Sequence, residues 1–98
     1  MMTKNSDSLH RLYEALLQLK TEEECRLFLD DLCTIRELQD LAQRLEVAVM
    51  LRQGSNYQTI SKNTGASTAT ICRVNKCLNY GDGGYAAVLD RMEKGEGQ

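Results

Sequence analysis

Apolar residues recur along the chain at spacings of three and four, which is the periodicity of one face of an α-helix. The pattern predicts a first helix over about residues 7–19, capped by Ser6, Asp7 or Ser8. Its apolar positions are Leu9, Leu12, Tyr13, Leu16 and Leu17. The chain is therefore expected to begin with an amphipathic helix.

Two threonines each precede a glutamate by three residues, which is the arrangement of a capping box. Thr21 with Glu24 predicts the start of a second helix, and Thr34 with Glu37 predicts a third helix that continues to Gly54. We expect the second helix to bury its apolar residues, which are Cys25, Phe28, Leu29 and Leu32. The third helix is apolar on more than one face near residues 45–51, which fits either contact with a second subunit or a central place in a monomeric core.

Glycines and polar turns divide the rest of the chain into three shorter helices. The expected ranges are 57–64, between a turn at Ser55-Asn56 and Gly65; 68–79, capped by Ser67; and 85–93, after the glycine-rich break at 81–84. The chain has no proline and 5% aromatic residues, which also favours helices over strands. The expected fold class is all-α, with about six helices.

The length and composition fit one domain over residues 1–98, because 98 residues with 42% hydrophobic side chains leave little room for a second core. The first residues lack the apolar run of a signal sequence, and eighteen consecutive apolar residues occur nowhere. We therefore expect a cytoplasmic protein with no membrane partner.

Catalysis and metal binding are both disfavoured by the residues present. The only histidine is His10, and the chain shows no glycine-rich phosphate loop and no pair of nucleophile and base. None of the four cysteines belongs to a Cys-x-x-Cys pair; they are Cys25, Cys33, Cys72 and Cys77. We expect reduced, buried or half-buried thiols, no metal, no cofactor and no enzyme activity.

Charge is distributed unevenly along the sequence. Residues 1–46 hold ten acids and six Lys or Arg, and residues 82–98 hold four acids and two Lys or Arg. Between them, residues 47–81 contain no acid and four cations, which are Arg52, Lys62, Arg73 and Lys76. The formal net charge of −2 therefore conceals one segment whose field attracts phosphate.

The segment Tyr57 to Val74 has the spacing of a helix-turn-helix. Ile60 is placed to meet Ile71 and Val74 across the turn, and Gly65 permits the positive φ that the turn requires. These inward positions also determine which residues of the motif face outward. The second helix of the motif would enter the major groove of DNA. The predicted DNA-binding residues are Gln58, Lys62, Ser67, Thr68, Ala69, Cys72 and Arg73.

Each predicted contact follows from the chemistry of its side chain. Gln58 and Lys62 could reach the DNA backbone or the groove edge, and Ser67 with its neighbouring amides suits a phosphate oxygen. Arg73 is the one side chain here that could read guanine through two hydrogen bonds. The same hairpin spacing occurs in other helical proteins, so the alternative is a helical protein–protein interaction module without DNA binding.

The run Gly65-Ala66-Ser67-Thr68-Ala69-Thr70-Ile71-Cys72-Arg73 resembles the turn and recognition helix of the Trp-repressor superfamily, particularly its YerC/YecD-like, Trp-repressor-related branch. The resemblance runs from about Leu9 to Met92 and is strongest over Gln43 to Asn79. It implies an intertwined homodimer, with 7–54 as dimerisation helices, 57–79 as the DNA-reading head and 85–93 as the C-terminal helix. It also implies a repressor that binds a palindromic operator on double-stranded DNA.

The resemblance further implies a candidate effector pocket formed by Thr34, Arg44, Arg73, Val74 and Cys77. Val74 and Cys77 stand where the family has glycine and serine, and a valine there obstructs an indole ring. Tryptophan is therefore disfavoured as corepressor. The heads are either already set for binding or respond to a smaller effector of unknown identity; Arg44 also fits a surface arginine, and Arg73 a phosphate contact.

Overall fold

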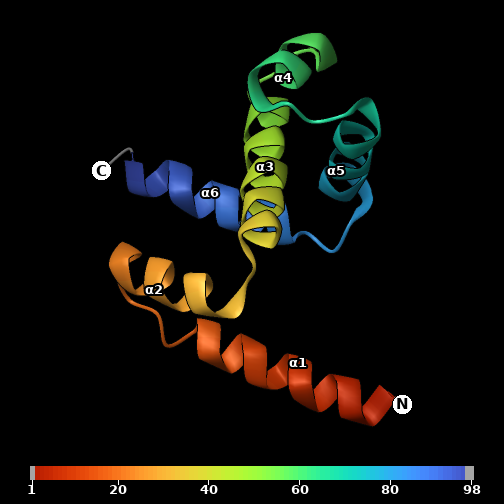
Figure 1. Ribbon diagram of the computed structural model, residues 1–98. Coiled ribbons are helices and arrows are strands. Elements are labelled where there is room, and N and C mark those ends of the chain that lie inside the picture. Colours follow the sequence, from red (N-terminus) through yellow and green to blue (C-terminus); the bar gives the residue numbers. More distant parts are fainter. Residues whose placement is uncertain (1, 97–98) are drawn as a thin grey trace. The chain divides into compact units, whose positions relative to one another are not determined.

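The computed structural model describes residues 2–96, and over that range it contains six α-helices and no strand (Figure 1). The helices are α1 (Met2–Leu16), α2 (Glu22–Leu32), α3 (Ile35–Arg52), α4 (Tyr57–Thr64), α5 (Thr68–Tyr80) and α6 (Gly84–Glu96). The prediction of an all-α fold with about six helices is confirmed.

Side chains cap four of the helices where the sequence predicted a start. Asn56 Oδ1 accepts a hydrogen bond from the Thr59 N–H at 2.8 Å and begins α4. At the start of α3, Thr34 Oγ1 accepts from the Glu37 N–H at 3.0 Å, and Glu37 Oε1 accepts from the Thr34 N–H at 2.9 Å. These reciprocal bonds form a complete capping box.

In the capping box at the start of α2, the glutamate bonds to the residue before the threonine. Thr21 Oγ1 accepts from the Glu24 N–H at 3.0 Å, but the Glu24 carboxylate accepts from the N–H of Lys20 at 2.8 Å. Both bonds still satisfy donors at the helix entrance, so the predicted start holds.

The first helix differs from its predicted range of 7–19 at both ends. It begins at Met2, because polar residues within a helix cost only a few tenths of a kcal/mol each, roughly, and no proline or glycine stops it. It ends at Leu16, where Gln18 and Leu19 donate to carbonyls three residues back instead of four. This tighter turn ends the α-helix before Leu19.

The chain divides into two compact units, Met1–Leu38 and Gln39–Gln98. In the first unit, no residue of α2 is buried, and Leu32 is 51% exposed. The expectation that α2 buries its apolar residues within this chain is therefore wrong, although Cys25, Phe28 and Leu29 are half-buried. The apolar periodicity identified the helix correctly but did not identify what covers it.

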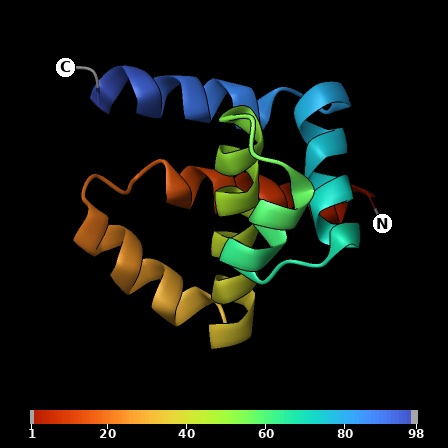
Figure 2. The ribbon, with the colours of Figure 1, turned by 90° about the horizontal axis from the view of Figure 1, so that it is seen from above.

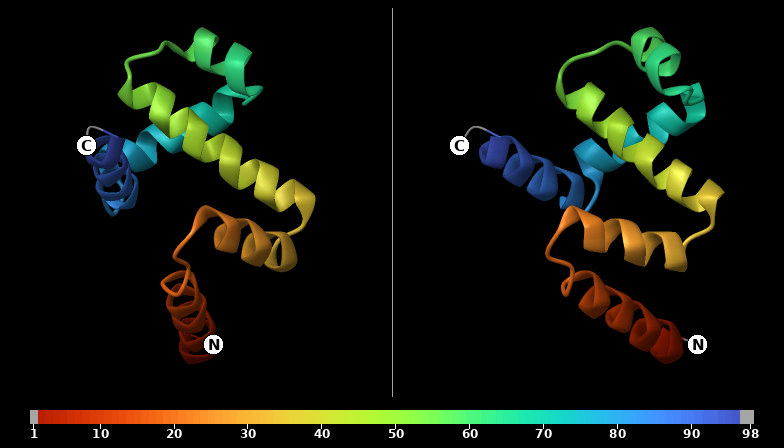
Figure 3. Two further views of the ribbon diagram at one scale, coloured as in Figure 1. Left: turned by 90° about the vertical axis from the view of Figure 1, so that its left-hand side faces the viewer. Right: turned by 60° about the vertical axis from the view of Figure 1, so that its left-hand side comes forward.

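The second unit has its own hydrophobic core. Within this unit α3 shares a core with α4, α5 and α6, which Figures 2 and 3 show from other directions. Each of the four helices contributes buried apolar residues, and the buried set is Val47, Ala48, Met50, Ile60, Ala66, Ile71, Val74 and Leu89. This core fixes the helix pair α4–α5.

Candidate nucleic-acid interface

Hydrogen bonds from side chains reinforce the glycine turn between α4 and α5. Gly65 has a φ of +75°, and its N–H donates to the Ser61 carbonyl at 2.8 Å. Ser61 Oγ donates to the Ala66 carbonyl at 2.9 Å, while Thr64 Oγ1 accepts from the Ala66 N–H at 3.1 Å. The two hydroxyl groups thus satisfy both backbone groups of buried Ala66, a role that spacing alone did not reveal.

The turn is also tied to α3. Gln43 Nε2 donates to the Thr64 carbonyl at 3.1 Å, from 21 positions earlier in the chain. Ile60 and Ile71 are fully buried, and Val74 is 1% exposed. The predicted inward positions are therefore confirmed, and the α4–α5 pair has the geometry of a helix-turn-helix.

Ser67 caps α5 and is occupied by that role. Its Oγ accepts from the Thr70 N–H and donates to Thr70 Oγ1, both at 3.1 Å. The amide groups of Thr68 and Ala69 lie in the first turn of α5, where the helix itself offers no acceptor. The amides suit a phosphate oxygen better than the engaged Ser67 hydroxyl does.

The other predicted contact residues on α5 share one exposed face. Ala69, Cys72 and Arg73 are exposed, and Cys72 and Arg73 lie three and four positions after Ala69. Thr68 is also exposed, one residue before Ala69. The structure thus groups the proposed base-reading residues on the side of α5 opposite the core.

Gln58 and Lys62 lie at a hollow between α4 and the start of α5. The hollow has a volume of about 370 Å³ and is also lined by Tyr57, Ser61 and Thr68. Tyr57 was not among the predicted contacts, although its place directly after the Asn56 cap could have identified it. It adds a hydroxyl group and an aromatic edge to the candidate interface.

Arg52 does not contribute to the cationic surface that its charge suggested. Its Nη2 lies 2.6 Å from Asp90 Oδ1 and 3.6 Å from Glu93 Oε2, and its Nη1 donates to the Ala86 carbonyl at 3.3 Å. The hydrogen bond with Asp90 raises the pKa of Arg52. The acid-free segment therefore offers three cations to DNA instead of four: Lys62, Arg73 and Lys76, all exposed.

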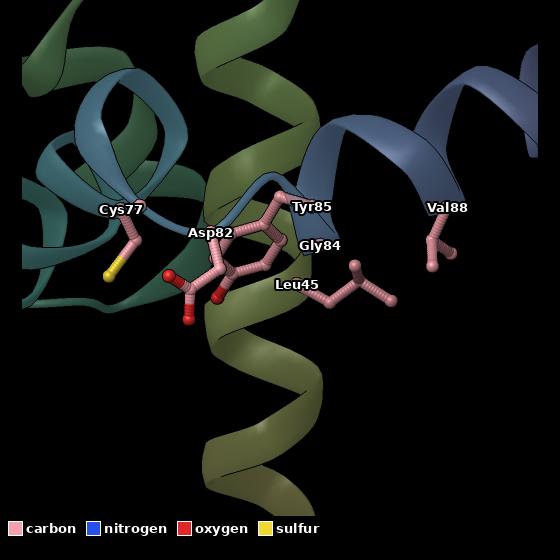
Figure 4. A pocket seen from close by; sticks show the side chains of 7 residues that line it. Leu45, Cys77, Asp82, Gly84, Tyr85 and Val88 are labelled. Atoms are coloured by element: carbon pink, nitrogen blue, oxygen red, sulfur yellow. The ribbon is translucent and has the colours of Figure 1, made fainter.

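A second concave surface lies between α3, the end of α5 and the start of α6 (Figure 4). It is an open, mainly apolar groove of about 590 Å³, lined by Leu45, Cys77, Gly81, Asp82, Gly84, Tyr85 and Val88. Gly81 is required there, because a Cβ atom would stand 2.4 Å from the Cys77 carbonyl oxygen. The groove is thus built around a close contact between the end of α5 and the following loop.

Comparison with known proteins identifies the family. Residues 7–93 match the family described as Trp repressor protein. The chain belongs to the Trp repressor protein family. It is 58% identical over 88 residues to a protein of Bacillus subtilis (strain 168) named YerC, covering 90% of this chain and 85% of that one.

Two solved structures have the same fold as this member of the Trp repressor protein family. One is a Trp repressor candidate from Staphylococcus aureus, with a TM-score of 0.85, 50% identity, and coverage of 89% of this chain and 87% of that chain. The other is a TrpR-like protein from Eubacterium eligens ATCC 27750, with a TM-score of 0.85, 48% identity, and coverage of 89% and 90%. The predicted Trp-repressor-like fold is confirmed, and the chain is a DNA-binding regulator in the general sense of its family.

The residues predicted to form the effector pocket lie in different surroundings within their own units. Val74 lies in the hydrophobic core with Ile60 and Ile71, whereas Arg73 is exposed on the outer face of α5. Cys77 lines the open groove, and Arg44 is half-buried on α3, next to Leu45 of that groove. Thr34 belongs to the first unit, where it caps α3.

The thiols only partly follow the expectation. All four cysteines are free; Cys25 and Cys33 are half-buried, as expected, but Cys72 and Cys77 are exposed. Both lie on faces of α5 turned away from the core, which the cysteine count could not reveal. Among the described residues, none of the helices has the length and apolar character needed to cross a membrane.

Proposed function

We propose that this chain is a cytoplasmic, sequence-specific transcriptional repressor that binds a palindromic operator as a homodimer. One observation carries the proposal: a capped helix-turn-helix places Thr68, Ala69, Cys72 and Arg73 on the exposed face of α5. A helix presented in this way fits the major groove of DNA.

The first unit supports the homodimer. Its exposed apolar side chains include Leu9, Tyr13, Leu27, Leu32 and Ile35, whose exposed fractions range from 47% to 78%. Apolar surface of this extent on neighbouring helices favours association with a second chain. Because a dimer carries two identical reading heads, a palindromic operator follows from its symmetry.

The head is set for binding without tryptophan. Val74 is 1% exposed and lies in the core with Ile60 and Ile71, at a position where the resemblance to the family implies glycine, and this burial supports a head that needs no tryptophan. Addition of tryptophan is therefore expected to change neither the operator affinity nor the melting temperature. A large increase in either one contradicts a preset head.

Selection of binding sites from random duplex DNA tests the proposal directly, with and without a mixture of amino acids. An enriched palindrome whose half-sites lie about 10 base pairs apart supports a dimeric regulator. Enrichment that changes with the mixture reveals an effector. If no sequence is enriched even at low salt, the DNA-binding proposal fails and the protein-interaction alternative gains support.

The role of Arg73 is resolved by measuring Arg73→Ala on the selected site and on a scrambled duplex. Loss of a phosphate contact weakens both duplexes and lowers the slope of log K against log salt by about 0.9 per contact. Loss of a base contact instead weakens mainly the selected site, by about 1–3 kcal/mol.

A further inference from the structure

Arg52 joins α3 to α6. It lies at the C-terminal end of α3, and its three polar partners all belong to α6: the Asp90 and Glu93 carboxylates and the Ala86 carbonyl. The Arg52 side chain is 26% exposed, compared with 56% for Arg26, whose ion pairs stay within α2. Arg52 is thus a partly enclosed link between helices.

This link lies close to α5. A hollow of about 370 Å³ between the three helices is lined by Arg52, Asn75, Asn79 and Asp90, among others. Asn75 and Asn79 belong to α5, and Asn79 Nδ2 donates to the Asn75 carbonyl at 3.0 Å. The Arg52 link therefore stands at the junction where α3, α5 and α6 meet.

A short loop and a shared core connect α6 to the end of α5. Only residues 81–83 separate α5 from α6, and the Gly81 N–H donates to the Cys77 carbonyl at 2.9 Å. Leu89 of α6, at 3% exposure, lies in the same core as Ile71 and Val74 of α5. A shift of α6 along α3 would thus be transmitted to α5 through both the loop and the core.

From this geometry we infer that Arg52 is a positioning residue, which fixes the orientation of the recognition helix by holding α6 against α3. The inference rests on the proposed DNA-binding function. A dimer must present both α5 helices at the separation of two half-sites. If the orientation of each α5 is fixed, the dimer will therefore prefer one spacing between half-sites. Arg52 would provide this fixed orientation through its ion pairs with α6.

Operator spacing is the measurement that tests this role. A series of duplexes carries the selected half-sites at separations that differ by single base pairs. Binding of the protein to each duplex is measured well below the melting temperature of the protein. Arg52→Met keeps the apolar stem but removes the charged group. We expect it to reduce the preference for the best spacing over its neighbours by about two- to fivefold, which is the size of the contribution of an exposed ion pair.

Three further variants separate an effect on helix orientation from an effect on stability alone. Arg26→Met removes an arginine whose ion pairs are confined to one helix, and it should leave the spacing preference unchanged. Arg52→Asp combined with Asp90→Arg reverses the pair and should restore the preference at least in part. If Arg52→Met does not fold, Asp90→Asn weakens the same link more gently and should give an intermediate loss of preference.

Each outcome has a definite meaning. A broadened spacing preference that the reversed pair rescues supports the inference. A lower melting temperature with unchanged spacing preference overturns it, while the proposed DNA-binding function stands. Failure of the unaltered protein to bind any duplex overturns both.

Discussion

The two units of the chain use their apolar residues in opposite ways. The second unit buries eight apolar residues, distributed over α3, α4, α5, the turn at Ala66 and α6. In the first unit, Leu17 is 81% exposed, Ile35 is 78% exposed, and α2 has no buried residue. The second unit is therefore held together by its own core, whereas the first unit carries exposed apolar surface.

The ion pairs show the same contrast. Arg26 pairs with Glu23 at 2.7 Å and with Asp30 at 3.2 Å, both within α2. Arg52 pairs with Asp90 on a different helix, 38 positions away in the chain. Pairs within one helix stabilise that helix locally, while the pair between helices contributes to tertiary structure.

The largest expected effect compares two isoleucines. Ile60→Ala removes a fully buried side chain and should destabilise the second unit by about 2–5 kcal/mol, through lost burial and the cavity that remains. Ile35→Ala makes the same change at a site that is 78% exposed and should change the stability of dilute protein by less than about 0.5 kcal/mol. Urea denaturation followed by circular dichroism measures both. Equal losses would show that Ile35 is buried in solution, as it would be in the interface of a dimer.

A smaller effect is expected at the turn of the reading head. Gly65→Ala forces a side chain into a φ of +75° and should cost about 1–2 kcal/mol. Steric overlap adds little, because the nearest atom to the new Cβ would be Gln43 Nε2 at 3.9 Å. Gly95→Ala is the control: it lies in a helix with open space around it and should stabilise by up to about 1 kcal/mol. Thermal melts of both variants check the sign as well as the size.

Removal of the cap of α2 should affect the two units differently. Thr21→Ala removes the acceptor for the Glu24 N–H and should cost about 1 kcal/mol of α2 stability. Because α2 contributes nothing to the buried core of the second unit, amide exchange should accelerate in α2 and stay slow around Ile71. Acceleration throughout both units would show that they unfold together.

The smallest effect concerns pH and the pair within α2. The hydrogen bond from Arg26 lowers the pKa of Glu23. Because the pKa of Glu23 is lower in the folded state, the pair stabilises the helix at pH values above the unfolded-state pKa. This contribution is lost as the pH falls through the folded-state pKa. A carboxyl titration by NMR should show the Glu23 pKa rising toward its ordinary value in Arg26→Met. An unchanged pKa would mean that the pair does not form in solution.

Local signals in the sequence predicted the elements well. Asn56, Ser67 and Gly65 define the ends of α4 and α5 because each residue type has a specific conformational or hydrogen-bonding role at a helix end. Burial of Ile60, Ile71 and Val74 followed from their spacing in the same way. These features depend on neighbours within a few residues, which a sequence displays directly.

Features that depend on distant partners were not predicted. The charge of Arg52 suggested phosphate attraction, but its partners are contributed by a helix more than thirty positions away. The apolar face of α2 was visible, yet its exposure depends on which surfaces other segments supply. The Ser61 and Thr64 bonds to Ala66 required the turn geometry before they could be recognised. The roles of the contact and effector residues stay predictions.

The burial of Val74 bears on how such a protein could be regulated. A head that needs no ligand has no small-molecule signal to report, so promoter occupancy would follow the number of dimers present in the cell. Since dimers form by mass action, occupancy would rise more steeply than the amount of chain synthesised. The burial of this one side chain would thus make promoter occupancy depend on the synthesis and degradation of the protein, and not on the concentration of a metabolite.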